Sequence, residues 1–263
     1  MHLSKRITSF VLTVFMLTCF TTSINAENIT ESELNDYLLL TGITSEELDA
    51  TPYEQKVLIC NTLFFDESAQ YVDSSLVSSE GIIKAENSGT NIVPLGAIPT
   101  SDLSLSVTCW LSNGRLLVYP TYEWKVPVKP RGKDFFGYSS SDSYSAVPGR
   151  RSNLAYIKDD FYTNGKWVAD SSLDYTASAL TGYQHQGGSL GTPDRAMYFK
   201  AHCFYELDID SSNPVKKIVL SYVHDKSWGG SFSYGISYGL ISISVTPYSS
   251  SVDYQNNVYY LSY

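Results

Sequence analysis

Three histidines outside the first 26 residues, His185, His202 and His224, are the side chains from which acid–base or nucleophilic chemistry would start. A Ser-His-Asp relay requires its three groups to be in contact, and so many Ser and Asp residues are present that composition alone selects no triad. His202 and His224 fit equally well as ordinary strand residues. We therefore predict a non-enzymatic protein with no catalytic residue assigned, and keep a secreted hydrolase as an alternative.

Residues with metal-binding chemistry are scattered rather than grouped. Asp208-Ile209-Asp210 and Asp159-Asp160 could offer oxygen ligands to calcium, but neither fits the alternating ligand positions of an EF-hand loop. His202 and Glu206, four positions apart on a strand, would lie about 13 Å apart, too far to hold one ion. The sequence predicts neither a metal ion nor another cofactor.

The one basic concentration of the chain adjoins two aromatic residues. Tyr122 and Trp124 flank Glu123, which suits a sugar-binding surface and equally suits a strand with two different faces. We expect the partner to be an extracellular ligand or a component of the cell envelope, with an anionic membrane surface as the alternative. Tyr-rich loops over 130–191 should add contacts. The predicted binding surface comprises Tyr122, Trp124, Lys125, Arg131, Arg150 and Arg151.

Residues 231–247 alternate between apolar residues and Ser or Gly, as a membrane-spanning β-hairpin does. A strand with one solvated face has the same pattern. The phase of the alternation slips beside Gly239, which indicates a bulge or a tight bend. The second functional hypothesis is therefore a membrane-active, bacteriocin-like antimicrobial or pore-forming protein. Its membrane-active strand would use Phe232, Tyr234, Ile236, Tyr238, Ile241 and Ile243.

The first 26 residues predict export. Lys5 and Arg6 precede an uncharged, mostly apolar run, and Ala26 offers a small residue for cleavage, so residues 1–26 read as a signal peptide. Removing it takes two of the 18 basic residues and none of the 27 acidic ones, which leaves a net charge of −11. So acidic a chain is a poor match for nucleic acid. The mature protein is expected to be secreted.

Cleavage also leaves three cysteines, Cys60, Cys109 and Cys203, which allow at most one disulfide. Cys109 and Cys203 both fall on the apolar faces of expected strands. In an exported protein we expect them to pair with each other, with buried free thiols as the alternative. Cys60 would then be the unpaired cysteine.

The elements that must position these residues change character near residue 68. Helices are expected over 31–41, 45–49 and 52–63, because Thr-x-x-Glu capping boxes begin at Thr30, Thr44 and Thr51. Beyond them the hydrophobic period becomes two, and Asn113-Gly114 marks a hairpin. Pro120 argues for an edge or broken strand, and 130–191 for long loops with short strands. We predict a signal peptide (1–26), an acidic helical segment (27–67) and an antiparallel β-sandwich (68–263).

Two short segments resemble secreted proteins of Gram-positive bacteria that have no assigned function. They are Tyr122-Glu123-Trp124-Lys125-Val126-Pro127 and Tyr222-Val223-His224, the latter followed by a Ser/Gly-rich alternating strand. The resemblance implies secretion and brings no catalytic residues. In size and composition the chain is also broadly similar to some large secreted bacteriocin-like proteins.

Overall fold

The computed structural model describes residues 29–78, 83–84, 96–128, 134–141, 144–160, 163–170, 174–176, 182–186, 196–210, 215–225, 232–237, 240–245 and 252–263. The predicted signal peptide lies outside these ranges. In the described part of the chain, no helix is long and apolar enough to cross a membrane.

Three helices open the described chain: α2 (Glu31–Leu40), α3 (Ser45–Ala50) and α4 (Tyr53–Leu63). Thr30 and Thr44 form the predicted capping boxes with Glu33 and Glu47. The third predicted capping box, at Thr51, does not form. Thr51 closes α3 and donates its hydroxyl to the carbonyl oxygen of Glu47, so that Pro52 becomes the N-cap of α4 without a side-chain hydrogen bond.

Twelve of the described strands join in one antiparallel-dominated sheet, in the order β8-β7-β11-β5-β4-β1-β15-β12-β6-β10-β9, with β3 parallel to β15. A separate three-stranded sheet has the order β13-β14-β2. The bounds are β1 Gln70–Ser78, β2 Ile83–Lys84, β3 Gly96–Ala97, β4 Leu103–Ser112, β5 Arg115–Trp124, β6 Phe135–Ser140, β7 Tyr144–Lys158, β8 Val168–Ala169, β9 Asp174–Thr176, β10 Gly182–Gln186, β11 Tyr198–Ile209, β12 Lys217–Asp225, β13 Phe232–Ser237, β14 Leu240–Val245 and β15 Val252–Ser262.

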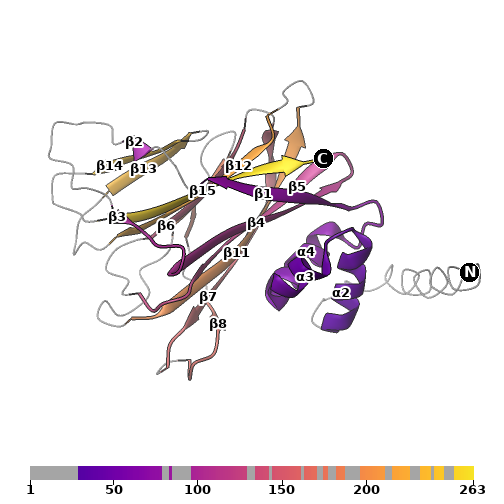
Figure 1. Cartoon of the computed structure of the whole chain (residues 1–263), viewed down its shortest axis with the longest axis horizontal. Helices are drawn as coiled ribbons and strands as arrows, with labels where there is room; N and C mark the ends of the chain where they lie inside the picture. The colour runs from indigo at the N-terminus through magenta and orange to yellow at the C-terminus, as the bar shows by residue number, and fades with distance from the viewer. Residues whose placement is uncertain are drawn as a thin grey trace, which may run out of the picture.

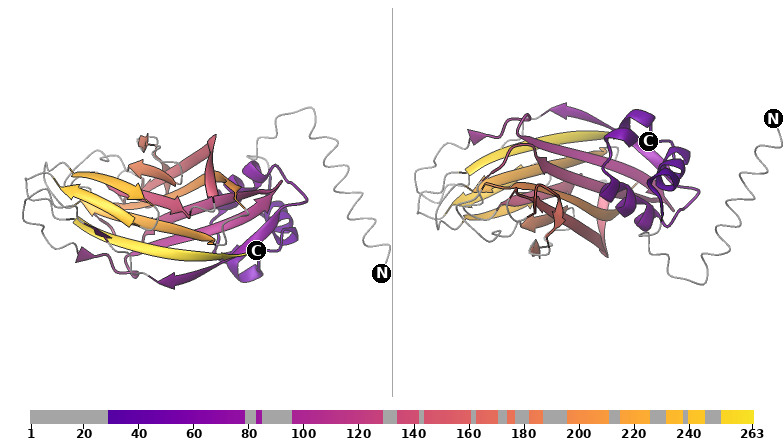
Figure 2. Two further views of the ribbon diagram at one scale, coloured as in Figure 1. Left: turned by 90° about the horizontal axis from the view of Figure 1, so that it is seen from above. Right: turned by 90° about the horizontal axis from the view of Figure 1, so that it is seen from below.

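The large sheet folds over itself along β1. Residues 70–72 pair with β4, whereas Asp73 and the residues after it pair with β15. The first layer therefore holds β8-β7-β11-β5-β4 and the second holds β15-β12-β6-β10-β9 (Figure 2). Rings from the two layers meet in the core, where Tyr138 of β6 stacks on Tyr205 of β11 with centroids 4.7 Å apart. The predicted class, a mainly antiparallel β-sandwich preceded by a short acidic helical segment, is confirmed.

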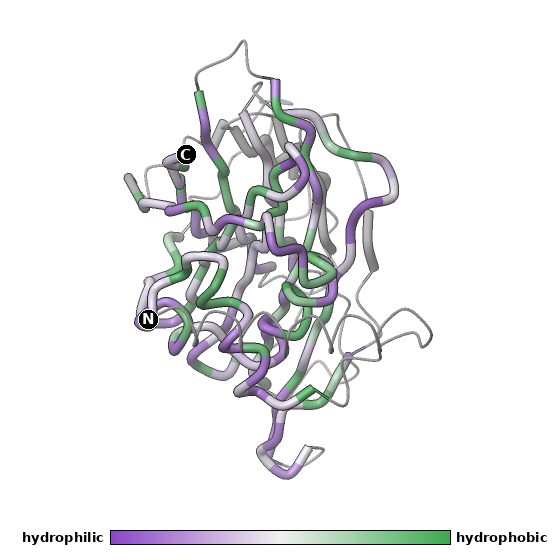
Figure 3. The backbone as a smooth tube through the Cα atoms, turned by 90° about the vertical axis from the view of Figure 1, so that its right-hand side faces the viewer, coloured by the Kyte–Doolittle hydropathy of each residue, from purple (hydrophilic) through white to green (hydrophobic). Residues whose placement is uncertain are grey.

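The helices cover part of the outer face of the first layer (Figure 1). Leu34, Leu38 and Ile59 contribute to a second apolar core with Trp110 and Tyr119 from the sheet. The indole of Trp110 donates to Thr41 Oγ1 at 2.9 Å. Figure 3 shows hydrophobic stretches of the backbone interleaved with hydrophilic ones, and between the two cores β5 is buried continuously from Leu116 to Tyr122. The first layer is thus buried on both faces where the helices lie.

The hairpin at Asn113-Gly114 is confirmed, since both residues have positive φ (51° and 75°) and Ser112 pairs with Arg115. The prediction of an edge strand at Pro120 is wrong, because β5 lies between β4 and β11. Pro120 pairs with Val107 of β4, while the pairing with β11 is interrupted between Thr121 and Val118. The ladder therefore has a gap where proline lacks an N–H group.

The expectation of loops over 130–191 is wrong for β7, a strand of 15 residues. It pairs with β11 along almost its whole length, and its register shifts once, between the partners Tyr205 and Leu207. Gly149 near this shift has a φ of +76°. Such an irregularity interrupts the simple alternation by which a strand is recognised in a sequence.

The predicted disulfide is absent: Cys60, Cys109 and Cys203 are free, buried thiols. Cys109 and Cys203 both face the sandwich core, as expected, but they lie in the same layer on β4 and β11, with β5 between them. Two strand spacings are about 9.5 Å. A disulfide requires Cα atoms within about 7 Å, so the intervening strand keeps these thiols apart.

Candidate functional site

The structure separates the residues predicted to form one binding surface. Tyr122 and Trp124 are each 4% exposed, and their rings pack in the core against Phe136 and Tyr222. Their placement on a surface was wrong, because β5 directs its even-numbered residues into the sandwich. Lys125 is exposed beyond the end of β5, whereas Arg150 and Arg151 lie midway along β7. Arg131 lies outside the described residues.

A different group of aromatic and basic side chains gathers on the outer face of the first layer. On β7 and β11, Tyr156 lies opposite Lys200 and Lys158 lies opposite Tyr198, and Trp167 comes from the connection to β8. We call these five residues the aromatic–lysine patch. All of them are half-buried except Lys200, which is 4% exposed. The patch therefore presents three partly accessible rings on a rigid sheet.

The lysines of the patch contact the rings through cation–π geometry. Lys158 Nζ lies 4.3 Å from the ring centroid of Tyr198 and 4.9 Å from that of Trp167. Lys200 Nζ lies 5.0 Å from Tyr156 and 4.8 Å from Trp167. Each contact of this kind contributes about 0.5–1 kcal/mol when exposed and more when desolvated. Together they fix the orientation of the indole.

A tight turn after β7 carries Trp167 back over the sheet. Thr163 Oγ1 accepts from the N–H of Asp159 and donates to its carbonyl oxygen, at 2.9 and 2.6 Å. Asn164 and Gly165 follow with φ of 51° and 70°, the left-handed conformation that these two residue types tolerate. β8 then pairs with Tyr156 and its neighbour, so Trp167 sits directly beside the strands that hold the lysines.

Beneath the patch lies His202, with 3% of its surface exposed. Neither ring nitrogen has a hydrogen-bond partner, and the ring lies edge-on to Tyr156 with centroids 6.0 Å apart. Burial, and secondly the charge of Lys200, lower the pKa of His202 to about 4. The side chain is thus neutral at physiological pH, and no carboxylate among the described residues is hydrogen-bonded to it.

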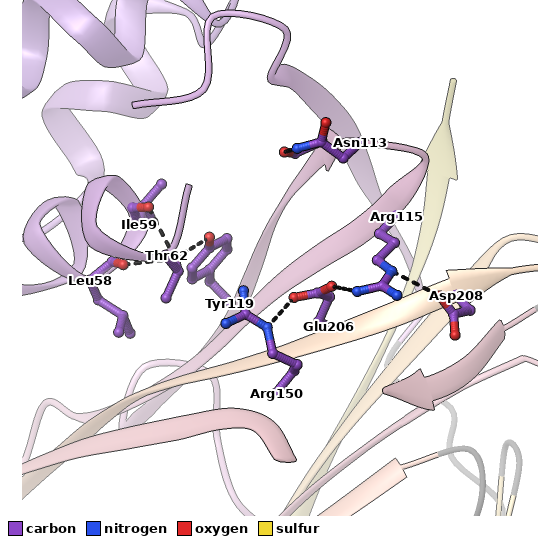
Figure 4. Close-up of polar contacts among 10 residues, drawn as sticks. Leu58, Ile59, Thr62, Asn113, Arg115, Tyr119, Arg150, Glu206 and Asp208 are labelled. Carbon is purple, nitrogen blue, oxygen red and sulfur yellow. Dashed lines mark hydrogen bonds and ion pairs between the residues drawn. The ribbon is translucent and has the colours of Figure 1, made fainter. Parts of the chain in front are cut away.

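Arg150, which the sequence suggested for ligand binding, instead forms an ion pair with the buried carboxylate of Glu206. Its Nε atom lies 2.6 Å from Oε2 of Glu206, and Arg115 Nη1 lies 2.6 Å from Oε1 (Figure 4). Arg115 also reaches Asp208 at 3.0 Å. Burial would raise the pKa of Glu206, but the hydrogen bonds and charges of the two arginines outweigh it and lower that pKa.

A second polar cluster lies at the end of the sandwich away from the helices. His224 Nδ1 is 2.8 Å from Oδ1 of Asp134, and the Tyr222 hydroxyl donates to Oδ2 at 2.7 Å. Burial, and then the charge of Asp134, raise the pKa of Tyr222, which keeps its hydroxyl protonated as a donor. Tyr222 and His224 thus share the carboxylate of Asp134.

The spacing Gly187-Gly188-Ser189-Leu190-Gly191 matches a Gly-x-Ser-x-Gly nucleophile elbow. It lies outside the described residues. An elbow connects a strand to a helix, whereas the described helices all precede residue 64 and the surrounding elements are strands.

The predicted membrane-active segment forms the hairpin of β13 and β14 rather than one strand. The phase slip at Gly239 coincides with the connection between Ser237 and Leu240, which are paired. Gly239 itself, where the sequence predicts a bulge or a tight bend, lies outside the described residues. Five of the six predicted residues lie in these strands, and Tyr238 lies outside the described residues.

Sequence reasoning missed the aromatic–lysine patch. Its members come from segments about 40 residues apart that only the pairing of β7 with β11 brings together. The available signal was Asn164-Gly165, a hairpin dipeptide separated from Trp167 by one residue.

No protein-family model and no curated protein matches the chain. Solved structures with related shapes include the collagen-binding subdomain ACE19 of the Enterococcus faecalis surface protein ACE, with 5% identity and a TM-score of 0.31, covering 55% of this chain and 88% of that one. The collagen-binding domain of the Erysipelothrix rhusiopathiae surface protein RspB matches with 10% identity and a TM-score of 0.31, over 57% of this chain and 48% of that one. The chain thus spans about half of the RspB structure.

The membrane-inserted form of the Clostridium perfringens NetB toxin matches with 8% identity and a TM-score of 0.28, over 71% of this chain and 94% of that one. Similarity at this level assigns no function to the chain.

Proposed function

We propose that this chain is a secreted, non-enzymatic binding protein that uses the aromatic–lysine patch to contact a glycan of the cell envelope or the surroundings. Secretion rests on the predicted signal peptide, and the resemblance to secreted proteins of Gram-positive bacteria belongs to the same proposal. Of the two histidines whose side chains the structure describes, the hydrolase alternative would have to use His224, which meets Asp134, because neither ring nitrogen of His202 has a hydrogen-bond partner.

The observation that carries the proposal is the accessible, pre-positioned indole of Trp167 between two lysines. Tyr and Trp dominate binding surfaces because they bury much area at little entropic cost. Here the ring is held by Lys158 and Lys200 before any ligand arrives. Binding would therefore cost little conformational entropy, because the surface is ordered before the ligand arrives.

The chemistry of the patch favours a polar polymer. Among the described residues, no carboxylate lies within ion-pair distance of Lys158, so its ammonium is available to an acceptor group on a ligand. Aromatic faces accept the C–H groups of sugar rings, and an ammonium binds their hydroxyl, carboxylate or phosphate oxygens. Lys200 is already shared with Glu54 of α4, at 3.4 Å.

The test is co-sedimentation of the mature protein with purified peptidoglycan sacculi, with and without their wall polymers. Trp167→Ala and Lys158→Ala should each weaken binding by about tenfold, as expected for hot-spot residues. Tyr260→Ala is the matched control, because Tyr260 is also partly exposed and contacts a lysine, Lys217 at 4.6 Å, in the second layer. Equal binding by all three variants would place the ligand elsewhere, and no binding by the unmodified protein would refute an envelope glycan.

A further inference from the structure

The hairpin of β13 and β14 continues the register of two sandwich strands. β12 and β15 pair without a shift from Lys217–Tyr260 to Asp225–Val252. Phe232 comes seven residues after Asp225, and Val245 comes seven residues before Val252. Phe232 and Val245 pair with each other. The register of β12–β15 is therefore also the register of β13–β14. Residues 217–260 therefore have the register of one continuous hairpin, whose two strands are connected at 238–239.

The tip of this long hairpin is nevertheless not part of the hydrogen-bonded large sheet. β13 and β14 form the separate sheet with β2, where Ile241 pairs with Ile83 and Ser242 with Lys84. In Figure 1 this small sheet lies at the end of the molecule opposite the helices. Extending β12 and β15 into β13 and β14 would require release of the short pairing with β2 and of the contacts that β13 makes with β6 and β10.

Apart from Lys226 at its start, the segment between the two sandwich strands carries no charge. Residues 227–252 contain no Asp, Glu, Lys, Arg or His, and Lys226 and Asp253 stand on either side of them. The connection at 238–239 divides the segment into arms 227–237 and 240–250, each of 11 residues. A transmembrane β-strand needs about 9–11 residues, so either arm is long enough to cross a bilayer.

The register also sorts the hairpin residues by type. Phe232 pairs with Val245, Tyr234 with Ile243 and Ile236 with Ile241, while the intervening pairs are Ser233–Ser244 and Gly235–Ser242. Directly opposed residues of an antiparallel pair lie on the same face. One face is therefore apolar and aromatic, and the other is built of Ser and Gly. Transmembrane strands show this division, with the apolar face toward lipid.

We propose that residues 226–251 extend β12 and β15 into a transmembrane β-hairpin, and that several copies of this chain together form a pore in a lipid bilayer. Several copies are required because a lone hairpin has two edges whose backbone N–H and C=O groups would be unpaired in hydrocarbon. Neighbouring hairpins satisfy those groups when they close a ring. The Ser/Gly face then lines the water-filled centre. This activity goes beyond glycan binding and does not depend on the aromatic–lysine patch.

Dye release from phosphatidylcholine vesicles loaded with a self-quenching dye tests the proposal. The mature protein should release dye, and Ile243→Asp should slow release by at least about tenfold, because its carboxylate would face lipid. Ser244→Asp is the matched control: the same new charge, one residue along, faces the water-filled side and should leave release within about twofold. Both variants should keep the far-ultraviolet circular dichroism of the parent. Absence of release by the parent, or equal effects of the two variants, would overturn the proposal.

A second variant tests the movement itself and does not depend on how a new charge is tolerated. Lys84→Cys combined with Ser242→Cys places two thiols at paired positions of β2 and β14. The oxidised form should release no dye and the reduced form should release it, since the disulfide prevents the hairpin from leaving β2. Membrane-dependent oligomers should be captured by a chemical cross-linker only in the reduced form. Release by the oxidised form at the parent rate would contradict the proposed extension.

Discussion

Lys200 Nζ, on β11, lies 3.4 Å from Oε1 of Glu54, in the first turn of α4. The Lys200 side chain is 5% exposed and that of Glu54 is 31% exposed. The pair thus joins the acidic helical segment to the first layer beside the aromatic–lysine patch. Because the ammonium is buried, it depends on this carboxylate and on the two rings above it.

Glu54→Gln should therefore lower the free energy of unfolding by about 1–2 kcal/mol, since removing one partner leaves a buried charge poorly compensated. Urea unfolding followed by tryptophan fluorescence measures the change. Glu67→Gln is the control, because Glu67 is exposed and should change stability by less than about 0.5 kcal/mol. A loss at Glu54 no larger than at Glu67 would show that Lys200 is adequately held by the rings.

His202 predicts a specific dependence of stability on pH. Its pKa is about 4 in the folded chain and 6.5 in the reference state, so the unfolded chain binds the proton more tightly. Stability should consequently fall as the pH is lowered from about 6.5 toward 4. Between pH 7 and 4.5 the contribution of His202 is about 2–3 kcal/mol.

His202→Phe keeps an aromatic ring beside Tyr156 and removes the titrating group. Its unfolding free energy should lose about 2–3 kcal/mol less than that of the parent between pH 7 and 4.5. Comparing the two proteins cancels the titration of carboxylates that both share. Parallel pH curves would mean that His202 is hydrated or protonated in the folded chain.

The two arginines that hold Glu206 should act as a coupled unit. Arg115 and Arg150 are each more than 40% exposed, whereas the carboxylate side chain is 5% exposed. Arg115→Met or Arg150→Met alone should lower the free energy of unfolding only modestly, because one partner remains and the lost one was largely solvated. The double variant should cost more than the two single costs together, because Glu206 is then buried without a cation. Strict additivity in a double-mutant cycle, with Lys125→Met as an exposed control, would contradict the coupling.

Local rules predicted local structure well. The capping boxes at Thr30 and Thr44 and the turn at Asn113-Gly114 depend on neighbouring residues, and all three form as expected. Pro120 and β7 were misjudged because tertiary pairing decided them: β11 leaves a gap at the proline, and its long ladder supports a strand without clear alternation. Trp167 likewise contacts Lys200, which is distant from it in the sequence and is brought close only by the tertiary fold.

The face on which Cys109 and Cys203 lie was predictable from alternation, but the layer was not. Two apolar strand faces can oppose each other across a core or lie side by side in one sheet, and the period of two is the same in both cases. The position of β5 between β4 and β11 decides the matter. For the same reason Tyr122 and Trp124 were predicted on the wrong face of the sheet. They share one strand face, as the alternation indicates, but that face is buried.

The mature protein should accordingly contain three thiols and no disulfide. Its intact mass should be the same before and after reduction, and after unfolding it should take up three equivalents of an alkylating reagent. In the folded state the reaction should be slow, because burial raises the pKa of Cys60 to about 12 and also raises those of Cys109 and Cys203. A parent mass lower by two hydrogens, with Cys109 and Cys203 joined in a non-reducing peptide map, would require β4 and β11 to approach without β5 between them.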